Sequence, residues 1–208
     1  MGLVAVIFTL FLAQPVAADE EDPKYVLALG DSLTAGYQLN PEEAFPAQLQ
    51  AYLQNDGLSV QVINAGVSGN TSGEGLARLG WALGDIPGGV PDLAIVELGA
   101  NDAMRGVSPD KVRQNLSAII EQLQALGSKV LLAGMLAPPN MGPAYAAEFD
   151  PIYAELSAKY SVPLYPFFLD GVATVTDLVL PDGKHPTGEG VAVIVTRIAP
   201  LVKTLLAE

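Results

Sequence analysis

The stretch LALGDSLTAGY, residues 27–37, runs from an apolar segment directly into a polar turn and then a helical pattern. A strand-like run here delivers the chain to Gly30, Asp31 and Ser32. Three interpretations of Ser32 are open at this point: a helix cap, a phosphate-binding hydroxyl or a nucleophile. Gly-Asp-Ser after a strand is weak evidence by itself, since Asp and Ser commonly cap helices. The segments around this stretch decide the fold and the role of the serine.

Apolar runs rich in Val, Leu and Ile recur along the chain. They cover residues 25–30, 60–66, 92–99, 129–136 and 162–168. Nearly continuous apolar runs are typical of strands covered on both faces. Helical patterns lie between and after these runs, at residues 41–57, 71–83, 108–127, 144–160 and 187–207. The alternation predicts a three-layer, flavodoxin-like α/β fold, with a five-stranded parallel sheet of order 2-1-3-4-5 and helices on both faces.

The helix expected over 108–127 has the clearest local signals. Ser108 fits the N-cap, Pro109 the first helical position and Gly127 the stop. Its apolar side chains recur at helical spacing and predict one buried stripe. The stripe consists of Val112, Leu116, Ile119, Ile120, Leu123 and Leu126. Thr187 is the expected cap of the last helix.

The composition excludes several classes of partner and site. The 208 residues suggest one domain, and half of them are apolar, which is enough for a large core. Lys and Arg number 10 against 23 Asp and Glu, a net charge of −13, so nucleic acid and anionic membranes are not expected partners. The absence of cysteine excludes disulfides and thiolate metal sites. With a single histidine a catalytic zinc site is disfavoured, and we expect no metal and no cofactor.

The N-terminal segment is uncharged and then changes abruptly. Residues 1–18, MGLVAVIFTLFLAQPVAA, contain a short apolar run and end in small residues, and the acidic DEEDPK follows. This pattern predicts a secretory signal peptide over 1–18, although the segment has no Lys or Arg. The run is too short to span a bilayer. We therefore expect a single domain over 19–208, periplasmic or secreted, monomeric, and without an integral membrane segment after signal removal.

Polar residues follow the first three predicted strands. Ser32 follows the first strand, Gly69 and Asn70 the second, and Asn101 the third. In a sheet of order 2-1-3 these loops are neighbours at the carboxyl edge, where ligands bind in open parallel sheets. Since adjacent strands lie about 4.8 Å apart, Ser32, Gly69 and Asn101 can share one small site.

The single histidine, His185, lies three residues after Asp182 and just before the last helix. A serine hydroxyl is a weak nucleophile that needs an adjacent base, and an imidazole base can only be His185. Within a tight turn, Asp182 can accept a hydrogen bond from Nδ1 and leave Nε2 as the base. The first and fifth strands are roughly 14 Å apart, a distance the 168–185 segment easily spans.

An acyl-transfer reaction also needs donors aimed at the oxyanion of its tetrahedral intermediate. The candidates are the backbone N–H groups of Ser32 and Gly69 and the side-chain amide of Asn101. A glycine at 69 lets a substrate approach the backbone closely. The sequence therefore predicts a catalytic group of Ser32, Asp182 and His185, with an oxyanion hole formed by Ser32, Gly69 and Asn101.

Other acidic residues near these loops have simpler interpretations. Asp31 and Asp102 are expected to cap helices. Asp170 and Asp177 are alternative partners for His185, but neither shares a tight turn with it. Glu97, late in the third predicted strand, is expected to be buried or paired.

The pocket walls are expected in the loops around 74–82, 103–108 and 138–147. Met104 and Met141 are candidates for the pocket rim. Core positions are expected for the remaining apolar and aromatic residues of this region, Tyr145, Phe149, Ile152 and Tyr153.

Four blocks of this chain resemble those of the SGNH (GDSL) hydrolases, and no competing motif is present. The blocks are GDSLTAGY, GVSGNTSGEGLARL, ELGAND and DGKHP, and they extend over nearly the whole chain after residue 24. The chain contains no G-x-S-x-G, Walker, G-x-G-x-x-G or H-E-x-x-H motif. The match is to the multifunctional thioesterase I, lysophospholipase and arylesterase branch of the family.

The resemblance implies the same five residues in the same roles, a flavodoxin-like fold, and cofactor-independent hydrolysis. Two positions depart from the family blocks. Ala100 replaces a glycine next to Asn101, and Asn70 replaces an aspartate next to Gly69. Neither position is a proposed catalytic group.

The hypothesis that follows is an exported serine esterase that hydrolyses carboxylic esters and acyl thioesters through an acyl-enzyme. Its expected partners are small ester and thioester substrates with acyl chains. Two alternatives remain: a carbohydrate O-acetylesterase of the same family, and a flavin- or phosphate-binding module. The second leaves the DGKH segment without a role.

Overall fold

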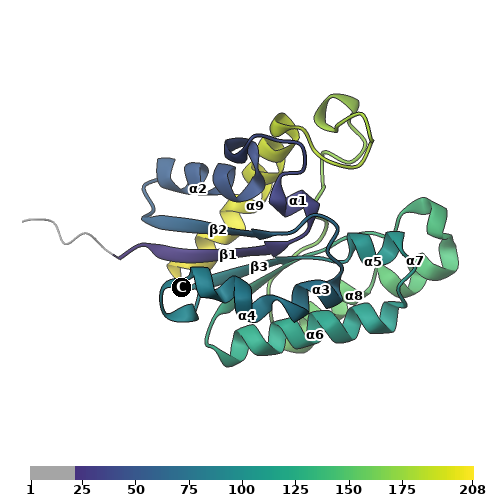
Figure 1. The fold of residues 1–208 in the computed structure, drawn as a ribbon, viewed down its shortest axis with the longest axis horizontal. Coiled ribbons are helices and arrows are strands. Elements are labelled where there is room, and N and C mark those ends of the chain that lie inside the picture. Colours follow the sequence, from purple (N-terminus) through teal and green to yellow (C-terminus); the bar gives the residue numbers. More distant parts are fainter. Residues whose placement is uncertain (1–21) are drawn as a thin grey trace, which may run out of the picture.

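A computed structural model describes residues 22–208 and contains a five-stranded parallel sheet (Figure 1). The signal peptide predicted over 1–18 lies outside these residues. The strands are β1 (Lys24–Gly30), β2 (Val60–Gly66), β3 (Leu93–Glu97), β4 (Lys129–Ala133) and β5 (Leu164–Tyr165). Their order is β2-β1-β3-β4-β5, as predicted. Because β1 lies between β2 and β3, the first three strand-end loops are neighbours.

Helices cover the sheet on both faces (Figure 1). One layer contains α1 (Ser32–Ala35), α2 (Phe45–Asn55) and α9 (Gly188–Ala207). The other contains α3 (Ser72–Ala77), α4 (Leu79–Ala82), α6 (Pro109–Ala125) and α8 (Ile152–Tyr160), with α5 (Ala100–Met104) and α7 (Pro143–Phe149) beyond the strand ends. Short 3₁₀ turns cover Pro41–Glu43, Leu83–Asp85, Pro87–Gly89, Pro139–Met141 and Thr176–Leu178.

The register aligns the carboxyl ends of the central strands. Gly30 at the end of β1 pairs with Gly66 of β2 on one side and with Glu97 of β3 on the other. The segments after these positions therefore leave the sheet at one level. The sequence predicts that these loops are neighbours. The register determines that they begin at the same level along the strands.

The α6 helix follows its sequence signals closely. Pro109 is its first residue and Ser108 its N-cap. The predicted stripe is buried from Val112 to Leu123, whereas Leu126 is 43% exposed. Leu126 was wrongly assigned to the stripe because the helix ends at Ala125 and the chain turns away there.

Three predicted elements are shorter or broken. Pro163 and Pro166 flank β5, and proline cannot donate to a strand ladder, so the predicted strand over 162–168 is limited to two residues. The predicted helix over 144–160 divides into α7 and α8 before Pro151, which is the N-cap of α8. The pattern over 71–83 divides into α3 and α4 at Arg78, whose φ of −102° and ψ of 4° interrupt the helix.

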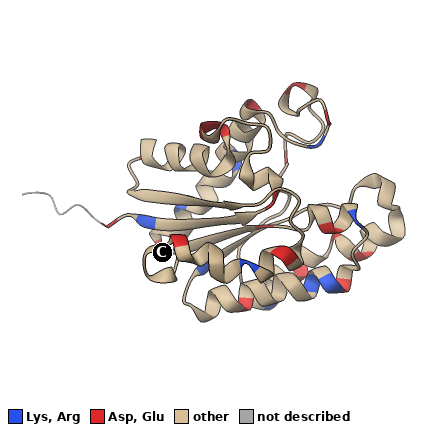
Figure 2. Cartoon of the chain, viewed as in Figure 1, with Lys and Arg blue, Asp and Glu red and all other residues tan. Residues whose placement is uncertain are grey.

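One helix of the described part, α9, has the length and apolar composition of a membrane span. It also packs against α2, and its apolar stripe from Val191 to Leu205 is buried in the core. That burial accounts for its apolar character. Figure 2 shows that positions of Lys and Arg and positions of Asp and Glu are distributed over the helices and loops of the described part.

Candidate active site

Ser32 is the first residue of α1, directly after β1. The helix cap is Asp31, whose Oδ1 accepts a hydrogen bond from the Leu33 N–H at 3.0 Å. The cap prediction for Asp31 is thus confirmed. Because the neighbouring carboxylate performs this function, the Ser32 hydroxyl is available for another contact.

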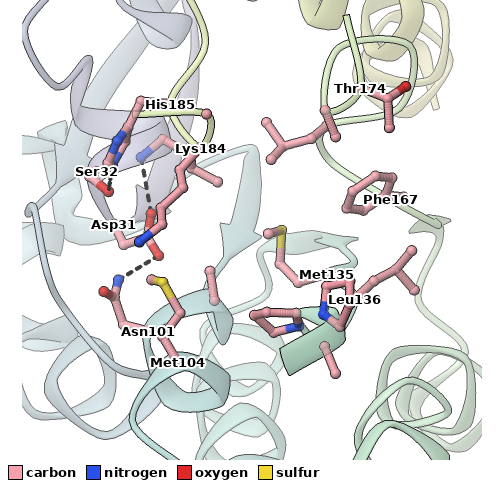
Figure 3. Close-up of a pocket in the computed structure, with 18 residues that line it drawn as sticks. Asp31, Ser32, Asn101, Met104, Met135, Leu136, Phe167, Thr174, Lys184 and His185 are labelled. Atoms are coloured by element: carbon pink, nitrogen blue, oxygen red, sulfur yellow. Dashed lines mark hydrogen bonds between the residues drawn. The ribbon is translucent and has the colours of Figure 1, made fainter. Parts of the chain in front are cut away.

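The Ser32 hydroxyl contacts the histidine across 153 residues of sequence. His185 Nε2 lies 2.9 Å from Ser32 Oγ, and His185 Nδ1 lies 2.6 Å from Asp182 Oδ2 (Figure 3 shows the first contact). The Tyr37 ring lies against the imidazole, with 4.4 Å between ring centroids. These contacts form a continuous chain of hydrogen-bonding groups from carboxylate to hydroxyl.

The turn around Asp182 explains how a short segment orients the imidazole. Asp182 Oδ1 accepts from the backbone N–H groups of Lys184 at 2.9 Å and His185 at 3.1 Å. Desolvation favours the neutral carboxyl, but the hydrogen bonds from the His185 ring and from the two backbone groups outweigh it and lower the Asp182 pKa to about 2. Asp182 is therefore ionised throughout the neutral range.

In the part of the chain that the structure describes, neither alternative carboxylate is hydrogen-bonded to His185, and that of Asp170 is engaged elsewhere. Asp170 pairs with Arg197 on α9. Asp177 contributes its backbone carbonyl, which accepts from the Thr187 hydroxyl at 3.5 Å. Among the described residues, Asp182 is the carboxylate in hydrogen-bond contact with His185.

The Gly69 loop is a tight turn that presents an unused donor. The Asn70 N–H donates to the Val67 carbonyl at 3.0 Å, and Gly69 has a φ of +85°, a conformation that favours glycine. Within residues 22–208 the backbone N–H groups of Gly69 and Ser32 make no hydrogen bond. Both donors are available to a ligand, as an oxyanion hole requires.

The Asn101 amide lies at the same place but is already bonded. Its Nδ2 donates to Asp31 Oδ2 at 2.9 Å and to the Asn70 carbonyl at 3.0 Å. An amide nitrogen has two hydrogens, so both are in use. To bind an oxyanion, Asn101 has to redirect or share one of these bonds. The geometry thus brings Asn101 to the expected place and adds a condition that the sequence did not indicate.

Comparison with known proteins agrees with this arrangement. The model of the GDSL-like Lipase/Acylhydrolase family matches residues 28–193. The chain belongs to this family. It is therefore an enzyme, a hydrolase of the GDSL class.

Relatives of known name extend over nearly the whole chain. An arylesterase of Vibrio mimicus is 39% identical and covers 96% of this chain and 98% of its own. The thioesterase 1/protease 1/lysophospholipase L1 of Escherichia coli (strain K12) is 36% identical and covers 87% of this chain and 84% of its own. The crystal structure of AlinE4, an SGNH-hydrolase family esterase, is 48% identical with a TM-score of 0.74, and covers 88% of this chain and 96% of its own.

Two carboxyl groups are buried beneath the site of this family member. Asp31 is fully buried, and desolvation raises its pKa to about 6, against the opposing hydrogen bonds from Leu33 and Asn101. Burial and the neighbouring Asp31 charge raise the pKa of Glu97 well above its ordinary value. Glu97 Oε2 accepts from the Thr34 hydroxyl at 2.8 Å, so Glu97 is both buried and hydrogen-bonded.

Asp102 is not the expected helix cap, since Gly99 is the N-cap of α5 and Thr71 that of α3, but it bonds the first residue of α3. Its two oxygens accept from the backbone N–H and the hydroxyl of Ser72, each at 2.7 Å, at the start of α3. Asn115 of α6 donates to the same hydroxyl at 3.0 Å. This buried contact ties α5, which holds Asn101, to α3 and α6.

A cavity of roughly 440 Å³ opens beside Ser32 and His185. Figure 3 shows Ser32, His185 and Asn101 on one side of it and Met135, Leu136 and Phe167 on the other. Its walls are mainly apolar. They include Leu33, Ala100, Met104, Met135, Leu136, Ala137, Pro138, Pro139, Phe167, Leu169 and Ala173.

The pocket differs in part from the sequence-based expectation. Met104 lines it, as expected, whereas Met141 does not, because its side chain approaches Gly106 instead. Pro138 and Pro139 belong to the wall loop expected at 138–147, whereas no residue of the expected loop 74–82 lines the cavity. The rest of the far wall comes from residues 135–137 and 167–174, which were expected to be strand or were left unassigned. Of the four expected core residues, Tyr145 is half-buried and the other three are buried.

The sequence did not indicate Arg78, which hydrogen-bonds at this edge of the sheet. An arginine within the largely uncharged segment 75–84 was the available signal. Among residues 22–208, no group of three or more His, Cys, Asp or Glu side chains is arranged to hold a metal ion.

Proposed function

We propose that this enzyme is an exported serine esterase that hydrolyses carboxylic esters and acyl thioesters through a Ser32–His185–Asp182 triad. The observation that carries the proposal is the contact of Ser32 Oγ with His185 Nε2 at 2.9 Å, with Nδ1 held by Asp182. Nucleophile, base and orienting carboxylate are the three parts that this chemistry needs.

In the proposed reaction, Ser32 Oγ attacks the carbonyl carbon while His185 Nε2 takes the hydroxyl proton. The tetrahedral oxyanion accepts hydrogen bonds from the Ser32 and Gly69 N–H groups and from a redirected Asn101 amide. Collapse expels the alcohol or thiol, which receives the proton from His185 and leaves an acyl-Ser32 ester. Water, deprotonated by His185, then attacks that ester, and the acid is released as Ser32 Oγ takes the proton back from His185.

The apolar cavity supports an acyl chain as the group bound next to the carbonyl. Met135, Leu136 and Phe167 offer it apolar surface within reach of Ser32. The relatives named arylesterase and thioesterase 1 support esters and thioesters as the substrate class. A carbohydrate O-acetylesterase is less favoured, because an acetyl group leaves most of this apolar wall unused. Family membership favours the hydrolase over a flavin- or phosphate-binding module.

Substitution of Ser32 by alanine tests the proposal. We expect Ser32→Ala to lower kcat on p-nitrophenyl butyrate by at least about 10⁴-fold, because no other group replaces the nucleophile. The matched control is Ser117→Ala on α6, which does not line the cavity and should retain native activity. Circular dichroism verifies folding of both variants. Near-native turnover by folded Ser32→Ala would exclude the triad.

Covalent trapping tests whether Ser32 is the nucleophile, and a series of substrates tests the proposed substrate class. Diisopropyl fluorophosphate should add one phosphoryl group to the native enzyme and none to Ser32→Ala, as measured by mass spectrometry. Parallel assays with p-nitrophenyl esters of increasing chain length, a fatty acyl-CoA and acetylated xylan compare the esterase with the carbohydrate alternative. Preference for acetylated xylan over all acyl esters would contradict the proposed substrate class.

A further inference from the structure

Arg78 lies at the junction of α3 and α4 and makes two hydrogen bonds to strand-end loops. Its Nε donates to Asn70 Oδ1 at 2.6 Å, and its Nη2 donates to the Gly30 carbonyl at 2.8 Å. One rigid guanidinium therefore joins the turn that follows β2 to the end of β1. These are the two segments that present the Gly69 and Ser32 N–H groups.

The third donor is connected to the same guanidinium through one residue. Asn70 accepts from Arg78 with its side chain and from Asn101 Nδ2 with its carbonyl, at 3.0 Å. Asn101 in turn donates to Asp31, which caps the helix that begins at Ser32. Hydrogen bonds therefore lead from Arg78 through Asn70 and Asn101 to Asp31, next to Gly30, which Arg78 also contacts. This ring includes all three loops of the proposed oxyanion hole.

The cost of this arrangement suggests a specific role. The guanidinium is half-buried, burial lowers its pKa, and its Nη1 is buried without a hydrogen bond among the described residues. Both acceptors of Arg78 are neutral oxygens, so no carboxylate compensates its charge through these bonds. Partial burial of a charged side chain without a carboxylate partner lowers the stability of the fold. We take this cost as an indication that the geometry enforced by Arg78 serves the site.

We propose that Arg78 is a positioning residue for the oxyanion hole, holding the Gly69–Asn70 turn against the carboxyl end of β1. This inference rests on the proposed function. It also explains the departure at position 70. The side chain there is required as an acceptor for Arg78 Nε, and an amide oxygen meets that requirement as a carboxylate oxygen does.

Arg105 supports the same turn from the outside and helps to define what Arg78 adds. Its Nη2 donates to the Gly69 carbonyl at 2.8 Å, and its Nη1 lies 3.5 Å from Glu74. That contact is exposed and restrains the peptide after Gly69. The Arg78 contacts restrain Asn70 against β1, and therefore set the distance between the Gly69 turn and Ser32.

The test is Arg78→Ala, assayed with p-nitrophenyl butyrate. We expect kcat to fall by about 10²-fold with KM changed less than about threefold, since a misplaced donor affects the transition state more than the ground state. Guanidinium chloride at a few tens of millimolar should restore part of the lost kcat, and sodium chloride at the same concentration should not. Arg78→Lys lacks the planar guanidinium, so its kcat should be lower than that of Arg78→Ala measured with guanidinium present.

Arg113→Ala on α6 is the matched control. Arg113 pairs with Glu155 at 2.5 Å on the surface, so its loss should leave kcat unchanged and insensitive to guanidinium. If folded Arg78→Ala keeps kcat within threefold of native, or loses activity through KM alone, the positioning role is wrong. An absence of guanidinium rescue in a folded variant with low kcat would also contradict it.

Asn70→Ala removes the other partner of the Arg78 hydrogen bond, and it tests the proposal if Arg78→Ala does not fold. It removes the Oδ1 acceptor and keeps both backbone groups, so a similar fall in kcat is expected. Asn70→Asp, which restores an acceptor, should recover most of that fall. Full kcat in Asn70→Ala would overturn the proposal. An active Ser32→Ala variant would instead refute the proposed function itself, so the two failures are distinguishable.

Discussion

Asp31 and Asp182 each adjoin the Ser32–His185 contact, but one carboxyl is fully buried and the other lies in a turn with 38% of its side chain exposed. Asp31 bonds to groups near and far in sequence, Leu33 and Asn101. The hydrogen bonds of Asp182 stay within three residues of it. The nucleophile side is therefore held by the tertiary structure, and the base side by a local turn.

This difference shows in the ionisation of the two groups. Burial raises the Asp31 pKa to about 6, whereas hydrogen bonds lower the Asp182 pKa to about 2 despite desolvation. The protein thus accepts an unfavourable ionisation where the nucleophile and the oxyanion donors must be rigid. At Asp182, where only the orientation of the His185 ring is needed, the carboxylate stays partly solvated and ionises readily. Predictions from this contrast separate effects on stability from effects on catalysis.

The largest effect is expected from Asp182→Asn. The amide still accepts from the backbone at 184 and 185, but its NH₂ group disfavours the Nδ1–H tautomer that leaves Nε2 as base. We expect kcat on p-nitrophenyl butyrate to fall by about 10³-fold. The free energy of urea unfolding at pH 7 should fall only by the solvent-screened stabilisation that the lowered pKa of this exposed carboxylate supplies. An unfolding free energy lowered by more than about 3 kcal/mol would exceed that contribution and show that the turn also supports the fold.

The second prediction concerns pH and the buried carboxyl. The folded-state pKa of Asp31 is raised above its ordinary value, so the folded protein binds this proton more tightly than the unfolded chain. Its contribution to stability is therefore most favourable below about pH 4 and declines as the pH rises through 6. From a shift of 3.8 to about 6, the loss approaches about 3 kcal/mol, and Glu97 acts in the same direction.

Urea unfolding between pH 4 and 7.5 measures this loss. Asp31→Asn should reduce the decline in unfolding free energy across that range. Asp182→Asn should leave the decline unchanged, because the lowered pKa of Asp182 makes its own contribution vary only below about pH 4. Equal pH dependence in native protein and Asp31→Asn would refute the burial argument.

The smallest effect is expected from a pair of glycine substitutions. A Cβ on Gly30 would lie 2.0 Å from Thr34 Oγ1 and 2.7 Å from Glu97 Oε2, two groups bonded to each other. We expect Gly30→Ala to cost about 2–3 kcal/mol of unfolding free energy. Gly183, in the histidine turn, has a φ of +67° and open space around it, so Gly183→Ala should cost only about 1 kcal/mol. Equal losses in thermal or urea unfolding would remove the contrast between the two regions.

Much of this architecture was predictable from the chain. Strand runs and helix signals act over a few residues, so Pro109 and Thr187 marked helix starts correctly. The order of the sheet followed from the alternation of elements. The predicted bounds of elements were wrong where prolines interrupt them, beside β5 and before α8.

The sequence by itself determined which residues were available: one histidine, an aspartate three residues before it, and polar groups after three adjacent strands. Only the tertiary structure decided how they are used. It committed both hydrogens of Asn101, buried Asp31 beneath the site, and brought Arg78 to Asn70 and Gly30. The physical reason is range. Strand and cap signals depend on neighbours along the chain, whereas a hydrogen bond between loops depends on sheet register and on side-chain direction, which no single segment contains.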